Sequence, residues 1–385
     1  MTFPAFSMQH KSLAGEKLVD ALRLIRTQNV GPVTFFQLIR RFGTAANALK
    51  ALPELSLRGG RSNALVAYDA SEAEKEIALA EKFGARFIMY GAADYPAILH
   101  AIPDAPPIIT MLGHAQLWKK DCVGVVGARN ASAAGCQFAA KLAKDLGDAG
   151  ITVVSGLARG IDSFAHKGSL VSGTVGVIAG GIDNIYPPEN APLYAQLRES
   201  GAIISEQPFG LAPFAGSFPG RNRIIAGMSL GSVIVEAAPK SGSLITARLA
   251  LEYNREVFAV PGSPLDPRSK GGNQLLKQGA IMVEAASDIL QGISHLRNAA
   301  LGETPKTLFD GVTQSTPTDE SELQTARRTI LEKLSVTPVS MDELATQCNL
   351  PPTIILTVLL ELELAGKLRR SAGGKVATTL QYENS

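Results

Sequence analysis

The sequence has few cysteines and no long apolar runs. Its three cysteines, Cys122, Cys136 and Cys348, are widely separated. Their odd number and spacing argue against a disulfide framework and a metal cluster, and favour a reducing compartment. The longest apolar candidate, residues 354–364, is interrupted by two glutamates, and the N-terminus lacks a charged-then-apolar signal pattern. We therefore expect a cytoplasmic protein with no metal and no membrane contact.

The sequence also lacks a large excess of charge of either sign. Its 37 basic and 35 acidic residues leave a net charge of only +2. This balance excludes a uniformly basic nucleic-acid binder, so any binding of nucleic acid must come from a local patch. Charged residues make up 19%, below the roughly 25% of typical globular chains. With 385 residues, 45% of them hydrophobic, the chain is long enough for two or three domains.

Residues 1–84 are expected to form a small helical domain. Apolar residues recur at helical spacing on both sides of the turn Asn29-Val30-Gly31-Pro32, and Gly43-Thr44 begins a third helix. A Val-Gly-Pro turn between short helices is typical of SAM-like and helix-hairpin-helix domains, in which turn amides contact a phosphate of nucleic acid. A helical bundle that only packs is the alternative for the same residues.

Residues 85–295 predict an α/β domain. Short apolar runs alternate with helical patterns at residues 123–126, 152–154, 175–178, 202–204, 232–235 and 257–260. Strands that are apolar throughout and separated by long connections are typical of a parallel sheet with helices on both faces. We therefore predict an extended Rossmann-like domain.

The chain is predicted to end in a linker, residues 296–322, and a winged-helix domain, residues 323–385. The linker prediction rests on two prolines, several Ser and Thr residues and few large apolar groups. Three helical patterns follow, and Ser340 with Glu343 forms a capping-box sequence at the second. Two short strands around a glycine turn come next. Three helices followed by such a hairpin predict a winged helix.

The hairpin, or wing, carries bases and no acid, which suits a phosphate backbone. Its bases are Lys367, Arg369, Arg370 and Lys375. The third helix, which reads the DNA groove in most winged helices, instead carries Glu361 and Glu363. We expect this helix to repel DNA. A protein contact or weak DNA binding is therefore at least as well supported as sequence-specific binding.

A glycine turn follows the first strand of the α/β domain, where a dinucleotide fold carries G-x-G-x-x-G. Here Arg129 occupies a position that a bound pyrophosphate needs free of side chains, and the second strand ends in Ser155 instead of an acid for a ribose. NAD is therefore disfavoured, and no cofactor is expected. An anion still fits, because Gly127 permits the turn, Ser132 can cap the helix and Arg129 can donate two hydrogen bonds to a phosphate. Pairing of Arg129 with a carboxylate is the structural alternative.

A glycine turn also follows each of the next two strands. The second turn contains Gly156, Arg159 and Gly160, and the third contains Gly181 and is followed by Tyr186. These turns lie at the carboxyl ends of neighbouring strands, where open parallel sheets bind ligands. The sequence therefore predicts one shared site at that edge of the sheet.

Farther along, aromatic and basic residues occur together. Phe218 precedes Arg221 and Arg223, and the strand at residues 232–235 leads to Lys240 at another helix start. Arginines for phosphates and aromatics for base stacking are what a single-strand groove needs. Tyr186 and Phe218 are the candidate stacking residues, with core packing as the alternative for Phe218. The predicted phosphate- and DNA-binding set is Gly127, Arg129, Ser132, Gly156, Arg159, Gly160, Gly181, Arg221, Arg223, Lys240, Ser241, Gly242 and Ser243.

The sequence shows no catalytic set. G-x-x-x-x-G-K-[ST] does not occur, and His166 lies alone inside a helical pattern after Asp162, which is more typical of a structural histidine than of a catalytic base. A Rossmann-like nucleotide-processing enzyme of the phosphoribohydrolase kind is the alternative function, with Asp183, Glu206 or Glu236 as its acid. Pairing of Glu206 or Glu236 with an arginine is the structural alternative. A winged-helix regulator with a small-molecule sensor is a third interpretation.

In these motifs the chain resembles the DNA-processing protein A (DprA/Smf) family. Ala128 stands where the family's first motif usually carries a serine. The resemblance rests on five ordered segments: Val126-Gly127-Ala128-Arg129, Ser155-Gly156-Leu157-Ala158-Arg159-Gly160-Ile161-Asp162, Gly180-Gly181-Ile182-Asp183, Phe218-Pro219 with Arg221-Asn222-Arg223-Ile224-Ile225-Ala226-Gly227, and Lys240-Ser241-Gly242-Ser243-Leu244-Ile245-Thr246-Ala247.

The resemblance implies a protein that is not an enzyme. It implies binding of single-stranded DNA without sequence preference, protection of incoming strands during natural transformation, and loading of a RecA-type recombinase. Arg129 and Lys240 match positive positions of the family's DNA pocket, and Arg159, Arg221 and Arg223 lie in its motifs. The family also implies a homodimer, here formed near Leu275, Leu276 and Ile281. Some members have the winged helix and others lack it.

Overall fold

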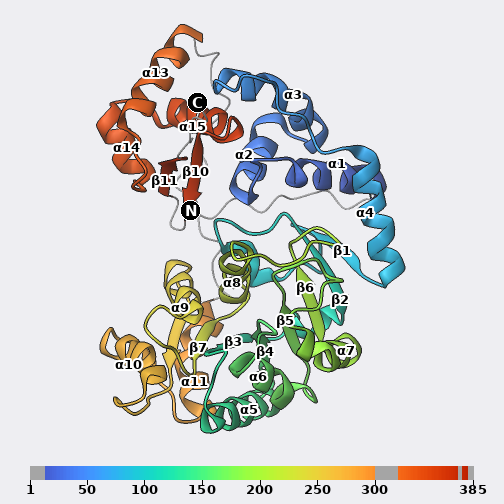
Figure 1. Cartoon of the computed structure of the whole chain (residues 1–385), viewed down its shortest axis with the longest axis vertical. Coiled ribbons are helices and arrows are strands. Elements are labelled where there is room, and N and C mark those ends of the chain that lie inside the picture. Colours follow the sequence, from blue (N-terminus) through green and yellow to red (C-terminus); the bar gives the residue numbers. More distant parts are fainter. Residues whose placement is uncertain (1–13, 300–319, 372–374, 380–385) are drawn as a thin grey trace. The chain divides into compact units, whose positions relative to one another are not determined.

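A computed structural model describes residues 14–299, 320–371 and 375–379 (Figure 1). Most of the predicted linker therefore lies outside the described residues. The chain divides into two compact units. We call residues 75–305 the α/β unit, and residues 10–74 together with 306–385 the helical unit. The α4 helix, Ala70–Phe83, runs along the chain from one unit into the other.

The α/β unit is built on a nine-stranded sheet of order β1-β2-β6-β5-β4-β3-β7-β8-β9. The pairs between β6 and β9 in this order are parallel, whereas β2 pairs antiparallel with β6 and β1. The strands are β1 Arg86–Met89, β2 Ile108–Gly113, β3 Cys122–Val126, β4 Thr152–Ser155, β5 Thr174–Val177, β6 Ala202–Ser205, β7 Gly231–Ile234, β8 Glu256–Ala259 and β9 Ile281–Met282.

The predicted parallel strands are confirmed as β3 to β8, each within about a residue of its expected bounds. Every residue of β3 to β7 is buried, which explains why these strands are mostly apolar and why their polar residues are small serines and threonines. The sequence did not predict β1, β2 and β9. Chain order reverses between β3 and β7, which makes that boundary the topological switch point of the sheet.

Helices pack against the sheet (Figure 1), and their apolar residues form hydrophobic cores with those of the strands. Apolar residues of α5, α6 and α11 pack with those of β3, β4, β7 and β8, including Leu142, Ile161 and Phe258. A second core joins α7 to β2 and β6 through Leu197 and Ile203. The helices are α5 Ala133–Asp148, α6 Ile161–Ser169, α7 Ala191–Ser200, α8 Ser217–Gly227, α9 Gly242–Glu252, α10 Lys270–Lys277, α11 Ala286–Gly292 and α12 Ser294–Ala299, with 3-10 turns at Ala97–Ala101, Ala115–Lys119, Pro188–Asn190 and Pro267–Ser269.

The helical unit combines the two ends of the chain. Its helices are α1 Ala14–Arg26, α2 Pro32–Phe42, α3 Ala45–Arg58, α13 Glu320–Lys333, α14 Met341–Cys348 and α15 Pro352–Leu364, and its hairpin is β10 Leu368–Ser371 with β11 Lys375–Thr378. The α2 helix begins with Pro32 after Gly31, and the Thr44 hydroxyl caps α3 by accepting from the Asn47 amide. The Ser340 hydroxyl caps α14 from the Glu343 amide at 3.2 Å, as the capping sequence predicts.

Glu361 corrects one expectation about the winged helix. This carboxylate does not face a DNA groove: it is fully buried, and Arg327 of α13 donates to it through Nε at 2.7 Å. Glu363 is likewise paired with Arg370, at 2.9 Å. Both acids are paired with arginines inside the unit, so their charges do not support the expected repulsion of DNA by α15. Its apolar residues instead belong to the core that contains Ile330, Leu344 and Val376.

Candidate functional site

A cavity of about 170 Å³ lies where the carboxyl ends of β3, β4 and β5 meet. This is smaller than the roughly 300–1,000 Å³ of pockets for drug-sized ligands, so it suits one base or one phosphate more than a dinucleotide. Six of the predicted site residues line it: Arg129, Gly156, Arg159, Tyr186, Phe218 and Arg221. The rest of the lining is Asn130, Ala158, Ile178, Ala179, Gly180, Asn184, Pro187 and Pro213.

An exposed arginine and two aromatic rings lie together in this lining. The Arg129 guanidinium carbon is 4.8 Å from the centre of the Phe218 ring. The Tyr186 ring is 5.9 Å from the same ring, and 48% of Tyr186 is exposed. Within the described part of the chain Arg129 makes no ion pair, so its charge is available to a ligand. The alternative of a carboxylate partner for Arg129 is thus not seen in these residues.

A second arginine, Arg221 of α8, lies buried beside the cavity. One of its Nη atoms donates to the Val177 carbonyl at 2.8 Å, and its Nε has no partner among the described atoms. Burial lowers the pKa of Arg221, and the buried Asp162 carboxylate opposes that shift. Burial raises the pKa of Asp162, although Arg221 and backbone amides counter it. An unpartnered buried donor is uncommon in native proteins and marks a place where a ligand oxygen or a water fits.

Two predicted glycines bring the turns together by close approach. A Cβ on Gly156 would overlap the Arg221 guanidinium, so only glycine lets that side chain lie against the turn after β4. Gly160 has a φ of +70°, and a Cβ there would overlap the carbonyls of Ala128 and Arg129. These glycines therefore hold the turns after β3 and β4 against each other, and they place both arginines at one cavity.

Arg159 and Arg223 are already paired within the chain. Arg159 forms an ion pair with Glu189, and both side chains are more than half exposed. Such a surface pair is weak, so a phosphate can compete for Arg159. Arg223 is nearly buried, pairs with Glu206 and lies within 3.8 Å of Asp104. Burial opposes the charge of Arg223, but these two acids outweigh burial and raise its pKa.

Lys240 and its neighbours lie apart from the cavity lining, at the start of α9. The Ser241 hydroxyl caps this helix and contacts the Ser243 hydroxyl at 2.7 Å. Asn222 of α8 donates to the Gly242 carbonyl at 3.2 Å. The α8 helix thus carries Arg221 toward the cavity and Asn222 toward the Lys240 turn. Lys240 itself is exposed and makes no ion pair within the described ranges.

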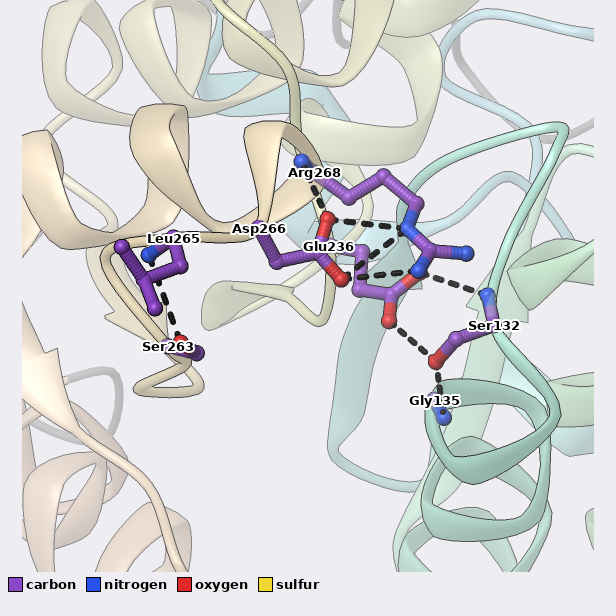
Figure 2. A network of polar contacts seen from close by, with 7 residues as sticks. All are labelled: Ser132, Gly135, Glu236, Ser263, Leu265, Asp266 and Arg268. Atoms are coloured by element: carbon purple, nitrogen blue, oxygen red, sulfur yellow. Dashed lines mark hydrogen bonds and ion pairs between the residues drawn. The ribbon is translucent and has the colours of Figure 1, made fainter.

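The helix start at the switch point is occupied by the chain's own carboxylate. Figure 2 shows Glu236, which follows β7, accepting from the Ser132 amide at 2.9 Å and from its hydroxyl at 2.6 Å. The same hydroxyl accepts from the Gly135 amide and caps α5. A Cβ on Gly135 would overlap Glu236, so this fit also depends on glycine. An anion at this helix start, where a dinucleotide fold binds pyrophosphate, would meet the Glu236 carboxylate.

The candidate acids and the histidine are held in structural contacts. Asp183 accepts from the Gly210 amide at 2.8 Å, and Glu206 pairs with Arg223. His166 is fully buried, and its Nδ1 lies 2.9 Å from the Thr174 hydroxyl. Burial and the nearby Arg221 charge lower the pKa of His166 to about 3. The described residues include no group of acids, histidines or cysteines that could hold a metal, and none of their helices is long and apolar enough to span a membrane.

Family models match almost the whole length of the chain. Residues 86–294 match the model of DNA recombination-mediator protein A, which covers more than half of the chain. The chain belongs to this family. Residues 15–78 match the DprA-like N-terminal HHH domain, and residues 314–374 match the DprA winged helix domain. The predicted resemblance to the DprA/Smf family and the predicted fold class are thereby confirmed.

Related Smf and DprA proteins match half of the chain or more. The protein Smf of Synechocystis is 32% identical and covers 90% of this chain and 95% of its own length. The DNA processing protein DprA of Bacillus subtilis is 43% identical over 54% of this chain and 71% of its own. The crystal structure of Streptococcus pneumoniae DprA superposes with a TM-score of 0.61 at 31% identity, covering 71% of this chain and 96% of that one. DprA proteins are DNA-processing, recombination-mediator proteins.

A second solved DprA structure concerns DNA directly. It is the structure of Helicobacter pylori DprA, a protein with a unique single-stranded DNA binding mode. It superposes with a TM-score of 0.50 at 28% identity and covers 56% of this chain and 96% of that one.

The sequence did not single out Asn130 and Asn184, which line the cavity with the predicted residues. Both lie in strand-end turns already recognised by their glycines. A search for amides in those turns, in addition to bases, would have found them.

Proposed function

We propose that this DprA-family chain binds single-stranded DNA without sequence preference at the cavity beside β3, β4 and β5. The observation that carries the proposal is the set of three features in one small lining: the unpaired Arg129, the buried Arg221 with an unpartnered Nε, and the ring pair of Tyr186 and Phe218. Cations for phosphates and aromatic faces for bases are the two components of sequence-tolerant single-strand binding.

The proposed path of the strand follows α8. Arg129 holds one phosphate at the cavity, and Lys240 holds another near the start of α9, where Asn222 links that turn to α8. One base enters the cavity against Phe218 or Tyr186. Arg159 joins by exchanging Glu189 for a phosphate. Arg223 and Ser132 support the shape of the site, because their contacts lie within the protein. The same holds for four predicted glycines that pack closely on neighbouring residues: Gly127, Gly156, Gly160 and Gly181.

The finer role is proposed from the resemblance to the family. We propose that the bound strand is protected during natural transformation and passed to a RecA-type recombinase, which places the protein in the cytoplasm and makes it a binding protein, not an enzyme. We also propose a homodimer at the edge strand β9 and α10. Leu275, Leu276 and Ile281 are partly exposed there, and 51% of Met282 is exposed. An apolar edge strand is a ready surface for pairing with a second copy.

A double variant tests the DNA site. Arg129→Ala with Lys240→Ala removes two phosphate contacts, so affinity for unrelated single strands is expected to fall by a similar factor of at least tenfold, since hydrogen bonds to charged groups contribute roughly 1.5–3 kcal/mol each. The slope of log affinity against log salt is expected to shrink by about 1.4, at about 0.7 for each single-strand phosphate.

The matched control for this variant is Lys82→Ala, which removes an exposed base on α4 outside the cavity lining. Fluorescence anisotropy at two salt concentrations measures both quantities. An unchanged affinity and slope in the double variant, or an equal loss in Lys82→Ala, would exclude this site.

A further inference from the structure

The third helix of the winged helix is docked on the chain's own N-terminal helices. Gly59, directly after α3, lies so close to α15 that a Cβ would overlap the Glu361 carbonyl. The Asn29 side-chain amide donates to the Leu364 carbonyl at 3.2 Å. Arg58 of α3 also lies 3.7 Å from Glu320 of α13. Backbone contact, a hydrogen bond and an ion pair therefore join the two ends of the chain into one unit.

This docking removes the usual DNA-reading surface. In a winged helix that reads DNA, the recognition helix lies in the major groove and exposes side chains to the bases. Here α15 has buried residues from Ile354 to Leu364, and its acids are paired with arginines. It presents no row of exposed donors for base edges. Any contact of this unit with nucleic acid must use another surface.

Such a surface exists where the turn between α1 and α2 meets the wing. A groove of about 350 Å³ has Asn29, Val30 and Gly31 on one side. The other side consists of Glu363 at the end of α15 with Leu368, Arg369 and Arg370 of β10. Both domains contribute to it, so the groove exists only while they are docked.

The groove carries a net positive charge. Its single acid, Glu363, accepts from Arg370 Nε at 2.9 Å, and both side chains are nearly buried. Arg370 also donates to Gln37 of α2 at 3.2 Å. Arg369 is exposed and makes no ion pair with any residue that the structure describes. The Glu363–Arg370 pair thus adds no net charge to the lining, and Arg369 supplies the positive charge.

The hairpin extends this charge beyond the groove. Arg369 pairs in register with Ala377, and Ser371 pairs with Lys375. Residues two apart on a strand share a face with their cross-strand partners, so Arg369 and Lys375 lie on the same face of the wing. Lys375 is exposed, and the wing strands contain no acid. Two cations in a row suit a ligand with regularly repeated negative charges.

We propose that this composite groove binds the phosphate backbone of a nucleic acid, at a second site separate from the cavity of the α/β unit. Arginine donates bidentate hydrogen bonds to phosphate, and the wall of the α1–α2 turn offers backbone instead of an acid. The only large apolar side chain of the wing wall, Leu368, is 4% exposed, so the groove lacks the apolar anchor on which protein partners depend. We expect the contact to be independent of sequence, because the Asn29 amide is bonded to the Leu364 carbonyl and Arg370 is bonded to Glu363 and Gln37, which leaves Arg369 for a phosphate.

The test uses the full chain carrying Arg129→Ala and Lys240→Ala, so that the second site is measured without the first. Arg369→Glu in this background is expected to lower residual affinity at least threefold and to reduce the salt slope by about 0.7 on single strands or about 0.9 on duplex. If Arg369→Glu weakens binding of only single strands or only duplex, that result identifies which nucleic acid supplies the phosphates. The control is Arg328→Glu, an exposed arginine on α13 that does not line the groove.

Several results would overturn the proposal. The background variant could show no residual binding at low salt, or Arg369→Glu could leave that binding unchanged. Arg328→Glu could weaken binding as much as Arg369→Glu does. Finally, polyglutamate could compete as strongly as an oligonucleotide of equal charge. Failure of the first site leaves this test intact, because the same comparison of Arg369→Glu with Arg328→Glu can be made in the unmodified chain.

Docking itself is tested by Gly59→Ala, which is expected to reduce residual affinity as Arg369→Glu does. Asn29→Ala is a milder variant that removes one docking hydrogen bond and is expected to give a smaller loss of the same kind. Full residual affinity in both variants would contradict the claim that the groove needs the docked domains.

Discussion

Replacing Gly156 by alanine places a methyl group where the Arg221 guanidinium now lies. The new Cβ would overlap three atoms of that group, so Arg221 must move. Moving it breaks the 2.8 Å hydrogen bond to the Val177 carbonyl and separates the buried Asp162 from its cation. A lost hydrogen bond to a charged group costs roughly 1.5–3 kcal/mol, and a buried charge without its partner adds to that. We expect the free energy of unfolding to fall by about 2–4 kcal/mol.

This prediction can be measured by tryptophan fluorescence and compared with a control variant on the same helix as Arg221. The chain's single tryptophan, Trp118, is buried in the α/β unit, so tryptophan fluorescence during urea unfolding reports on that unit. Gly220→Ala is the control, because it lies on the same helix as Arg221 and a Cβ there meets nothing within 4 Å. Alanine in a helix is favoured over glycine by roughly 0.5–1 kcal/mol, so this variant is expected to be slightly more stable.

DNA affinity supplies the second measurement on the same variants. Gly156→Ala is expected to weaken single-strand binding, because the displaced guanidinium changes the cavity, whereas Gly220→Ala keeps it. A Gly156→Ala variant with the unfolding midpoint and DNA affinity of the parent would refute the reasoning that close packing on this turn positions Arg221.

Three further predictions concern buried polar groups. Arg223→Met removes the cation that pairs with Glu206 and Asp104, and it is expected to lower the free energy of unfolding by about 3 kcal/mol. Variant protein that is folded, as checked by circular dichroism, is expected to bind DNA with the same dependence on salt as the parent. A changed salt dependence would assign Arg223 to the DNA site. His166 has a folded pKa of about 3, below the ordinary 6.5, so the unfolded chain binds its proton first and stability is lost as pH falls from about 6.5 toward 3. Between pH 7.5 and pH 5 this one group is expected to lower the free energy of unfolding by roughly 2 kcal/mol. In urea unfolding measured over this pH range, His166→Asn should show a weaker loss of stability. The same pH dependence in the variant and the parent would contradict a buried neutral His166. Burial raises the pKa of Cys122 to about 12, so a thiol reagent is expected to modify it only after unfolding; rapid modification of Cys122 in native protein, located by mass spectrometry, would show that the thiol is accessible.

The strands that could be predicted from the sequence are those buried on both faces. The runs that became β3 to β8 are mostly apolar and contain no charged residue, and that pattern can be recognised without knowing which strands pair. In contrast, Ile88 is the one buried residue among the four of β1, and β9 has only two residues, Ile281–Met282. The β2 run, Ile108–Gly113, is apolar but joins the sheet antiparallel, and nothing local in its sequence specifies that partner.

The candidate site was predictable in its turns but not in the direction of each side chain. Arg221 and Arg223 were treated alike, yet residues two apart on a helix face different sides. One therefore reaches the cavity and the other reaches Glu206. Helical periodicity alone could have separated them. The contact of Ser132 with Glu236 joins residues far apart in sequence, and no local signal predicts it.

The docking of α15 on α3 was also beyond sequence reasoning. The sequence pattern of each domain suggests an independent fold, because each domain has its own helices and helix caps. The glycine that permits the contact, Gly59, looks like an ordinary helix end. Its second role becomes visible only when Glu361 is placed beside it.

The most direct test of the central claim is a competition between single- and double-stranded oligonucleotides of scrambled sequence for the intact chain. We expect unlabelled single strands to displace a labelled single strand far better than duplexes of the same length do, and we expect scrambling of the sequence to change little. Equal displacement by duplex, or displacement by one sequence only, would contradict that claim.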